Sequence, residues 1–401
     1  MRVLPVILSA VLLLAAGCDS SPPAKPAPQT ADQQRVVGYF TDWGVYGRNF
    51  QVRNVDASGA AADLTHLMYA FGKLDGGKCT TSDKWADYEK PIAAADSVDG
   101  VADTPGAGLR GNFGQLRKLK AAHPRLKVIW SFGGWTGSKG FTEAAKDPAA
   151  FANSCYKLLT DPRWSGVFDG IDVDWEYPNA CGLVCDTSGP DALPGLLKSL
   201  RSTFGPEALI TAAVPGDLGK LKATDYAAAA RSADWLSAMT YDFFGTGGAG
   251  TGPTAPHSPL KAYPGIPRET STTDAAISGL LGLGIPPEKL LLGIGFYGRG
   301  WTGVSQAGPG GTASGPAQGS YDKGIEDYAV LQETCPPTGS IGGTSYAVCG
   351  GQWWGYDTPE TIKAKMAYAR SKALGGAFAW ELSGDTDDAR LVTAMKDGLS
   401  G

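Results

Sequence analysis

Three carboxyl-bearing residues stand at alternate positions in the run Ile171-Asp172-Val173-Asp174-Trp175-Glu176. Side chains alternate between the two faces of a β-strand, so a strand here places Asp172, Asp174 and Glu176 on one face. Carboxyl groups stacked on a buried face are costly unless protons or hydrogen bonds relieve them, and they share protons at shifted pKa values. The run therefore predicts a general acid, and Glu176, the last and most accessible of the three, is the predicted proton donor.

Two other interpretations of this run stay open from the residues alone. One is a solvated acidic edge strand, although the other face of the strand is strongly apolar. The other is a divalent-metal site made by the Asp pair, although the chain has only three histidines and no obvious further carboxylate cluster to complete it. We expect neither a metal ion nor a cofactor.

The elements that must position these residues follow a regular alternation from Arg35 onward. Eight short apolar runs predict strands: Val36–Thr41, Leu64–Phe71, Lys127–Phe132, Val167–Glu176, Ala208–Val214, Trp235–Tyr241, Lys289–Tyr297 and Gly376–Glu381. Helix-like segments lie between several of them: Phe113–Ala122, Ala149–Leu159, Ala192–Thr203, Asp274–Leu283 and Pro359–Lys372, the last with Thr358 as a plausible N-cap.

Strands that alternate with helices predict a parallel sheet. Eight such units predict an α/β fold of the closed (β/α)8 barrel type, with the active site at the C-terminal ends of the strands. An open doubly wound sheet is the alternative, and it is disfavoured because no glycine-rich dinucleotide fingerprint follows the first strand.

Two stretches are longer than ordinary loops, residues 72–111 and about 301–354. The second contains glycine-rich segments, two cysteines and apolar pieces such as Tyr328-Ala-Val-Leu331. A stretch of this size predicts a small inserted α+β subdomain between the seventh strand and its helix rather than one loose loop.

The N-terminal residues have the pattern of a targeting sequence. Residues 1–18 have a basic start, a short apolar run and small residues before Cys18, which predicts an export signal with a lipobox and lipidation of Cys18. The alternative is an ordinary signal peptide with a chance cysteine. Residues 19–34 are rich in Pro, Ala and Ser and predict a flexible tether. We therefore expect an extracellular protein anchored to the outer face of the cell membrane through this lipid alone.

Composition and cysteine count narrow the class of protein. Charged residues make up 19% of the 401-residue chain and the net charge is -5, which argues against nucleic acid as a partner. Apart from Cys18, six cysteines remain, and an even number in an exported protein suggests disulfides. Local pairing would join Cys181 to Cys185 and Cys335 to Cys349 and leave Cys79 with Cys155, but the sequence alone does not decide among the fifteen pairings. Zinc is the weaker alternative, because no histidine stands at ligand spacing to these cysteines.

The acidic run resembles the signature of glycoside hydrolase family 18, the chitinase family. The matching pattern is Asp169-Gly-x-Asp172-x-Asp174-x-Glu176-Tyr-Pro178. Segments resembling the family's motifs of the third, sixth, seventh and eighth strands follow in order: Ser131–Trp135, Met239–Asp242, Gly295–Trp301 and Gly376–Glu381. The resemblance covers about residues 35–401, which implies one catalytic barrel, and one branch of the family carries a small α+β insertion at the position of residues 301–354.

The resemblance implies retaining hydrolysis of β-1,4 linkages between N-acetylglucosamine units in chitin and chitooligosaccharides. In this family the substrate's own 2-acetamido oxygen attacks the anomeric carbon, so no carboxylate nucleophile is needed. Glu176 is then the acid and later the base, Asp174 orients the acetamido group, Asp172 supports Asp174, and Tyr241 hydrogen-bonds the acetyl oxygen. The expected substrate-binding residues are Asp242, Trp380 as the floor of the site, Trp135 as a stacking platform, Met239 and, as weaker candidates, Arg299, Tyr39, Tyr69, Phe71 and Tyr297.

Other functions stay open at this point. A hydrolase of other N-acetylglucosamine polymers, such as peptidoglycan or N-glycans, would use the same chemistry. A chitin-binding lectin on the same scaffold would have lost catalysis, but such relatives typically lack the final Glu of the motif, which is present here as Glu176. The insertion would deepen the substrate groove, which favours long linear chitin. We expect the chain to be a monomer.

Overall fold

The computed structural model describes residues 34–401 except 105, 107 and 248–249. The predicted signal sequence, the lipidation site at Cys18 and all but the last residue of the predicted tether lie outside the described residues. Within the described part of the chain, no helix has the length and apolar character needed to cross a membrane.

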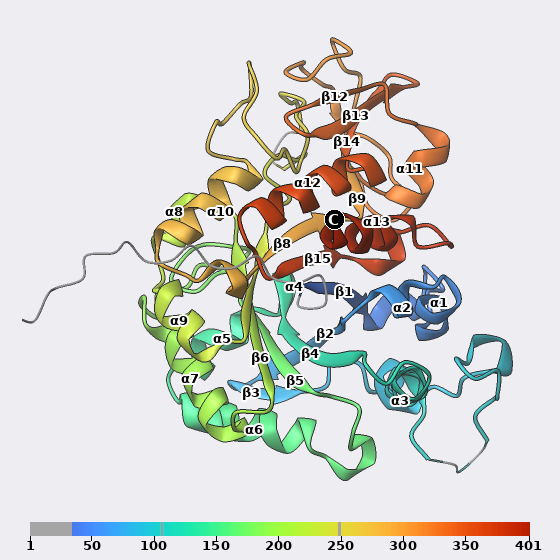
Figure 1. Cartoon of the computed structure of the whole chain (residues 1–401), viewed down its shortest axis with the longest axis vertical. Coiled ribbons are helices and arrows are strands. Elements are labelled where there is room, and N and C mark those ends of the chain that lie inside the picture. The colour runs from blue at the N-terminus through green and yellow to red at the C-terminus, as the bar shows by residue number, and fades with distance from the viewer. Residues whose placement is uncertain (1–33, 105, 107, 248–249) are drawn as a thin grey trace, which may run out of the picture.

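The described residues form a closed barrel of eight parallel strands (Figure 1). In chain order the barrel strands are β1 (Arg35–Thr41), β2 (His66–Asp75), β4 (Lys127–Gly133), β5 (Gly170–Asp174), β6 (Leu209–Pro215), β7 (Trp235–Met239), β8 (Leu290–Gly295) and β15 (Gly376–Trp380). Strand β1 pairs with β2 on one side and with β15 on the other, which closes the sheet. The predicted (β/α)8 barrel is confirmed, and the open doubly wound alternative is wrong.

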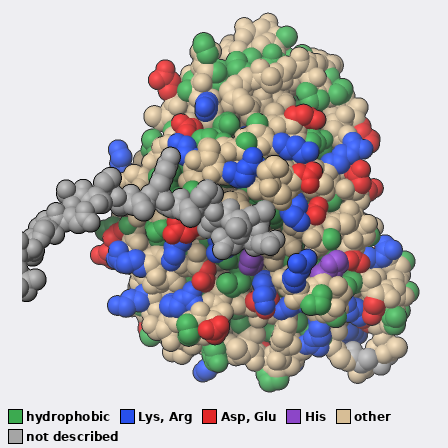
Figure 2. Space-filling view, viewed as in Figure 1, with side chains coloured by type: hydrophobic (Ala, Val, Ile, Leu, Met, Phe, Trp, Pro, Cys, Tyr) green, Lys and Arg blue, Asp and Glu red, His purple; other side chains and the backbone are tan. Residues whose placement is uncertain are grey.

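Helices surround the barrel: α1 (Val52–Ala57), α2 (Ala60–Asp63), α3 (Gly111–Ala122), α4 (Gly134–Gly137), α5 (Lys139–Ala144), α6 (Pro148–Leu159), α7 (Ala192–Phe204), α8 (Leu218–Leu221), α9 (Tyr226–Ser232), α10 (Thr273–Gly282), α12 (Pro359–Ser371) and α13 (Arg390–Ser400). The five predicted helices are confirmed to within two residues at each end. The Thr358 side chain accepts the backbone N–H of Thr361, as expected of an N-cap followed by Pro359. On the face drawn in Figure 2, acidic and basic side chains are interspersed.

Alternation along the strands separates two hydrophobic layers. One layer lies between the strands and the helices and includes Ile171, Val173 and Trp175. The other fills the barrel interior and includes Met68 and Phe378. Because successive side chains of a strand point to opposite faces, residues next to each other in sequence enter different layers. Asp172 and Asp174 therefore face inward, as predicted, while their apolar neighbours pack under the helices.

The long stretch after β8 folds as a second, antiparallel sheet. Its strands are β9 (Tyr297–Thr302), β10 (Gly315–Pro316), β11 (Ile325–Asp327), β12 (Gly339–Ile341), β13 (Thr344–Cys349) and β14 (Gln352–Tyr356), with α11 (Tyr328–Thr334) between β11 and β12. In Figure 1 this α+β unit stands at one end of the barrel strands. It extends slightly beyond the predicted 301–354, because only Phe296 separates β9 from the end of barrel strand β8.

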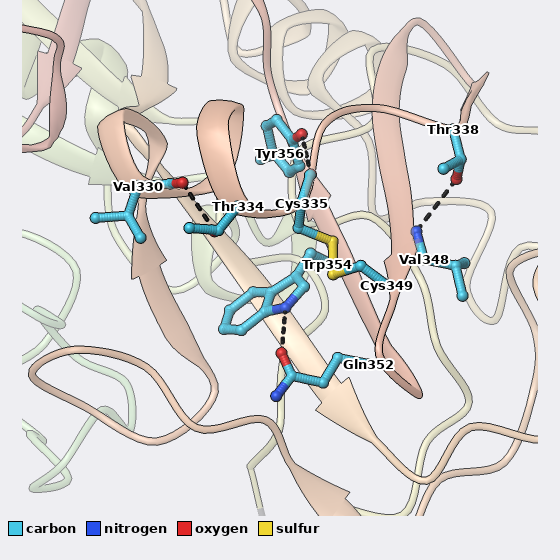
Figure 3. The surroundings of a disulfide bond; sticks show 9 residues. All are labelled: Val330, Thr334, Cys335, Thr338, Val348, Cys349, Gln352, Trp354 and Tyr356. Atoms are coloured by element: carbon cyan, nitrogen blue, oxygen red, sulfur yellow. Dashed lines mark hydrogen bonds between the residues drawn. A yellow bond between two sulfur atoms is a disulfide. The ribbon is translucent and has the colours of Figure 1, made fainter.

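Disulfides join Cys79 to Cys155, Cys181 to Cys185 and Cys335 to Cys349. These are the pairs that local pairing suggested, while the sequence alone left fifteen open. The last bond ties α11 to β13, and beside it the Tyr356 hydroxyl donates to the Cys335 carbonyl at 2.7 Å (Figure 3). Links of this kind limit the freedom of the unfolded chain, and the last one holds α11 against β13 within the insertion.

A buried ion pair joins the insertion to the barrel. The Lys365 ammonium of α12 lies 2.5 Å from Asp357, just after β14, and both side chains are fully buried. Lys365 also donates to the Ser258 carbonyl, and the Ser258 hydroxyl donates to Asp357. Since a buried charge is tolerated only with such partners, this cluster holds the segment around Ser258 in one place. That segment includes His257, which reaches the candidate site.

Candidate active site

The acidic run lies on β5, between β4 and β6, so its backbone is hydrogen-bonded on both sides. The alternative of a solvent-exposed edge strand is therefore wrong. Strand β5 itself ends at Asp174, and Glu176 follows two residues later, at the C-terminal rim of the barrel. This is the end at which barrels of this type carry their active sites.

Asp172 is the deepest of the three carboxyl groups and is fully buried. It accepts hydrogen bonds from Ser131 at 2.7 Å, from Thr211 at 2.6 Å and from the Tyr39 hydroxyl at 3.2 Å. Burial raises the pKa of Asp172 above its usual range even though these hydrogen bonds oppose the shift. The residue is therefore fixed from its two neighbouring strands, β4 and β6, and from β1 across the barrel.

Asp174 lies above Asp172 and is 5% exposed. Its Oδ1 is buried and has no hydrogen-bond partner among the described residues. Burial, followed by the charges of Glu176 and Asp172, raises its pKa well above the usual range. A buried carboxyl oxygen without a partner is costly, so Asp174 is poised to take a proton or a ligand donor.

Glu176 stands at the rim, where it is partly exposed. Burial raises the pKa of its carboxyl to about 7; the charge of Asp242 adds to the shift, while Tyr177 and Lys220 oppose it. Its backbone N–H donates to Ser138 Oγ at 2.8 Å, which fixes the peptide from the side of β4. A carboxyl group that keeps its proton near neutral pH is suited to general acid catalysis.

The turn after β7 brings a second charged group to the same rim. Arg299 binds the Asp242 carboxylate with both arms of its guanidinium, at 2.8 and 2.6 Å. Burial would raise the pKa of Asp242, but the charge of Arg299 and the neighbouring His257 ring hold it well below its usual range. The adjacent Tyr241 has a raised hydroxyl pKa, caused first by burial and then by Tyr297 and Asp174. Asp242 thus stays ionised while Tyr241 keeps its proton.

His257 fixes this turn from below. Asp242 has a positive φ of 56°, which is uncommon for a residue with a side chain, and its N–H donates to His257 Nδ1 at 3.3 Å. The Nε2 of His257 lies 3.0 Å from the Tyr297 carbonyl, which can only accept. His257 therefore carries its hydrogen on Nε2, and it links the turn after β7 to strand β9.

Aromatic rings form a platform at the same end of the barrel, near the ends of β15, β1 and β2. Trp380, at the end of β15, stacks on Phe71 with ring centroids 5.6 Å apart and meets Tyr39 edge-on at 5.4 Å. Trp43, in the loop after β1, is exposed, and its ring centroid lies 6.5 Å from that of Trp380. Trp135, in α4 after β4, is also exposed. Flat apolar surfaces of this kind suit the faces of sugar rings.

The structure brings most of the predicted site residues to one end of the barrel. Glu176, Asp174, Asp172 and Tyr241 surround its centre, and the others border it: Asp242, Arg299, Trp380, Phe71, Met239, Tyr297, Tyr39 and Trp135. Tyr39 is buried, with its hydroxyl on Asp172. Tyr69 does not join them, because it points into the outer layer and donates to Asp87.

Sequence reasoning missed four residues at this site: Trp43, Ser138, Lys220 and His257. Trp43 directly follows the first strand, so its position beyond a barrel strand was a usable signal. Lys220 reaches the site from α8 and lies 3.7 Å from the centre of the Tyr177 ring, and no pattern in the sequence indicates this. Among the described residues, no three or more His, Cys, Asp or Glu side chains gather so as to hold a metal ion.

Comparison with known proteins identifies the family. Chitinase 63 of Streptomyces plicatus is 57% identical over 94% of this chain and 62% of its own length, and chitinase C of Streptomyces lividans is 60% identical over 87% and 57%. The chain thus spans about three fifths of these relatives. The catalytic domain of the psychrophilic chitinase B from Arthrobacter TAD20 superposes with a TM-score of 0.86 at 35% identity, covering 92% of this chain and 96% of that domain. The model of glycosyl hydrolases family 18 matches residues 35–385, and the chain belongs to that family.

Proposed function

We propose that this protein is a chitinase that hydrolyses β-1,4 linkages between N-acetylglucosamine units in chitin and chitooligosaccharides with retention of configuration. The observation that carries the proposal is the column of carboxyls on and just after β5, where Glu176 has a pKa of about 7 above two buried aspartates. The similarity to chitinases of two Streptomyces species over most of the chain supports the choice of substrate.

In the proposed reaction, Glu176 donates its proton to the glycosidic oxygen while the 2-acetamido oxygen of the substrate attacks the anomeric carbon. The bond to the leaving saccharide breaks, and a cyclic oxazolinium ion forms. Glu176, now a carboxylate, takes a proton from the water that opens this ion. Because the anomeric carbon is attacked twice, the product keeps the β configuration.

Asp174 and Tyr241 are the proposed partners of the acetamido group. The buried Oδ1 of Asp174, which has no hydrogen-bond partner among the described residues, would accept the acetamido N–H, and the Tyr241 hydroxyl would donate to the acetyl oxygen. Asp172 would support Asp174 from below. Holding the acetamido oxygen against the anomeric carbon replaces a bimolecular step by an intramolecular one, which can account for a large part of the rate.

The remaining residues are proposed to hold the sugars. Trp380, stacked on Phe71, would form the floor under the reacting sugar. Tyr297, which packs on Tyr241, and Met239 would line the site beside it. The Asp242–Arg299 pair would bind sugar hydroxyl groups at the rim, and Trp135 would stack on a neighbouring sugar. We assign Tyr39 the task of holding Asp172 rather than touching the substrate, because its hydroxyl donates to that carboxyl.

Two measurements test the proposal. NMR of the first products from chitohexaose should contain the β-anomer, and initial α-anomer would exclude the substrate-assisted route. Glu176→Gln should still bind chitooligosaccharide but lose roughly 10²–10⁴ in kcat. Glu143→Gln, at an exposed carboxyl paired with Lys146, is the control and should keep full activity. Faster release of sugar from cell-wall sacculi or N-glycans than from chitooligomers would favour another N-acetylglucosamine polymer as the substrate.

We also propose that the protein is exported and anchored by a lipid at Cys18, on the strength of the sequence around that residue. In a bacterial host the unaltered protein should then fractionate with membranes, and Cys18→Ser should move it to the soluble fraction. A Cys18→Ser variant that stays in the membrane fraction would contradict lipidation, whereas secretion of both forms would leave an ordinary signal peptide as the explanation.

A further inference from the structure

Two buried carboxyls that the proposed reaction does not use lie where the loop after β1 meets the segment that follows β3 (Lys78–Thr80). Asp42, the first residue after β1, is 4% exposed, and Asp87 is fully buried. A buried carboxyl is costly unless it is protonated or hydrogen-bonded. The contacts of Asp42 therefore indicate both its protonation and its task.

Ser82 stands between the Asp42 carboxyl and the backbone of Phe71. Its Oγ lies 2.5 Å from Asp42 Oδ2 and 2.6 Å from the Phe71 carbonyl oxygen. Both are hydrogen-bond distances, and each hydrogen bond needs a proton between its two oxygens. The serine hydroxyl carries a single proton, and a carbonyl oxygen can only accept. The second proton must therefore be on the carboxyl, so Asp42 is neutral in this arrangement.

The three groups then form a chain of hydrogen bonds with one direction, here called the Asp42 relay. The Asp42 carboxyl donates to the Ser82 hydroxyl, and the Ser82 hydroxyl donates to the Phe71 carbonyl. If Asp42 lost its proton, two acceptors would compete for the one proton of Ser82. One of the two contacts would then be lost, so the relay is complete only while Asp42 is protonated.

The surroundings of Asp42 favour its neutral form. Burial raises the pKa of its carboxyl to about 7; its hydrogen bonds oppose the shift, and the charge of Asp83 adds to it. The other titratable groups that face it from β2, from the segment after β3 and from its own loop are Tyr69, Asp87 and Tyr46. None of these groups is a cation, so none of them would balance a negative charge on Asp42.

Both ends of the Asp42 relay belong to the aromatic platform of Trp380, Phe71 and Trp43. The carboxyl end is one residue from Trp43, and the carbonyl end is Phe71 itself. The Phe71 ring stacks on Trp380 with centroids 5.6 Å apart, and its centroid lies 6.0 Å from that of Trp43. The relay thus joins the loop that carries Trp43 to the strand end that carries Phe71.

We propose that Asp42, in its neutral form, is a positioning residue that holds Trp43 and Phe71 in place to receive a sugar chain. This role rests on the proposed function, in which the platform binds sugars. When Asp42 is ionised, the relay opens and a second negative charge faces Asp83. The platform is then less well held, and the affinity for chitooligosaccharide falls, whatever the protonation of Glu176.

The test measures binding without turnover. Glu176→Gln is the background, because it removes the titration of the proposed acid and should still bind chitohexaose. Calorimetric titration at pH 6, 7, 8 and 9 should show its dissociation constant rising roughly fivefold over this range, about the effect of one lost hydrogen bond. Glu176→Gln/Asp42→Asn should bind at every pH as the background binds at pH 6, because an asparagine amide donates to Ser82 at every pH.

Further variants in the same background separate the relay from a general effect of buried charge. Ser82→Ala removes the middle of the relay, so at pH 6 it should bind as weakly as the background does at pH 9. Ser82→Thr keeps the hydroxyl and should restore both the affinity and its pH dependence. Asp87→Asn is the matched control: it removes the other buried carboxyl and should keep the loss of affinity at high pH. Thermal melting checks that each variant is folded.

The pH profiles distinguish the outcomes. If the Asp42→Asn protein lost affinity in parallel with its background, or already bound weakly at pH 6, Asp42 would not hold the platform. If Asp87→Asn abolished the pH dependence while Asp42→Asn kept it, the effect would belong to Asp87 and the proposal would be wrong. A Glu176→Gln protein that bound chitohexaose at no pH would refute the proposed function, and the role of Asp42 with it.

Discussion

Glu176→Gln should make the protein more stable at high pH, and the size of the effect follows from the raised pKa. The Glu176 carboxyl moves from 4.5 to about 7 on folding, mainly because of burial. The folded state therefore binds this proton more tightly than the unfolded state. That contribution to stability is fully present below pH 4.5 and is lost as the pH rises through about 7.

At ~1.36 kcal/mol for each pH unit between these two values, the loss amounts to about 3 kcal/mol above pH 8. Glutamine is neutral at every pH and suffers no such loss. Removing the Glu176 charge also relieves Asp174, whose pKa is raised first by burial and second by that charge, and this acts in the same direction. The variant should match the unaltered protein near pH 4 and exceed it by up to about 3 kcal/mol at pH 8 to 9.

The assay is chemical denaturation of both proteins under non-reducing conditions at several pH values from 4 to 9. Glu143→Gln, at an exposed carboxyl, is the control and should not give a comparable gain in stability at pH 8 to 9. If the two stability curves ran parallel over the whole range, or if the glutamine variant were the less stable at pH 8, Glu176 would not be a buried group that retains its proton.

Other consequences follow from the same site. The kcat/KM for chitooligosaccharides should fall about tenfold per pH unit above pH 7, because the protonated form of Glu176 disappears. Initial rates from pH 5 to 9 measure this decline. A decline in kcat/KM that begins below pH 5 would contradict the prediction. Arg299→Lys should lower kcat/KM on the order of 10-fold, because lysine cannot hold both Asp242 oxygens. Arg163 binds Asp161 with the same two-armed geometry at the surface, so Arg163→Lys is the control and should have no effect on rate. Tyr39→Phe should reduce the free energy of unfolding by about 1 kcal/mol through loss of its bond to Asp172, and an unchanged denaturation midpoint would refute that contact's role.

Much of the barrel could be predicted because strand alternation is a local property. The carboxyls and the apolar residues of the run 171–176 separate to opposite faces whatever the rest of the chain does. Eight strand-like runs separated by helices then leave few ways to bury both sides of the sheet, and a closed barrel is one of them. The end of β5 was less predictable: Glu176 lies past the last strand residue, although its direction still follows the alternation.

Phe71 and Tyr69 illustrate where local reasoning fails. Both are aromatic residues two positions apart near the end of β2, so strict alternation sends them to the same face. The register between β2 and β4 shifts after Ala70, and Phe71 turns inward to stack on Trp380 while Tyr69 stays in the outer layer. A register shift depends on how the neighbouring strand fits, which no window of sequence around Phe71 contains.

The sequence by itself determined which groups could perform the chemistry: three carboxyls on one strand face, a Tyr-Asp pair after another strand and aromatic residues at strand ends. Only the tertiary structure decided their protonation and their surroundings. The pKa of Glu176 depends on how much water its neighbours exclude, and the link from His257 to Asp242 joins residues from separate loops. The alternation of side chains along a strand is a local property, whereas burial and packing depend on residues that the fold brings together from distant parts of the chain.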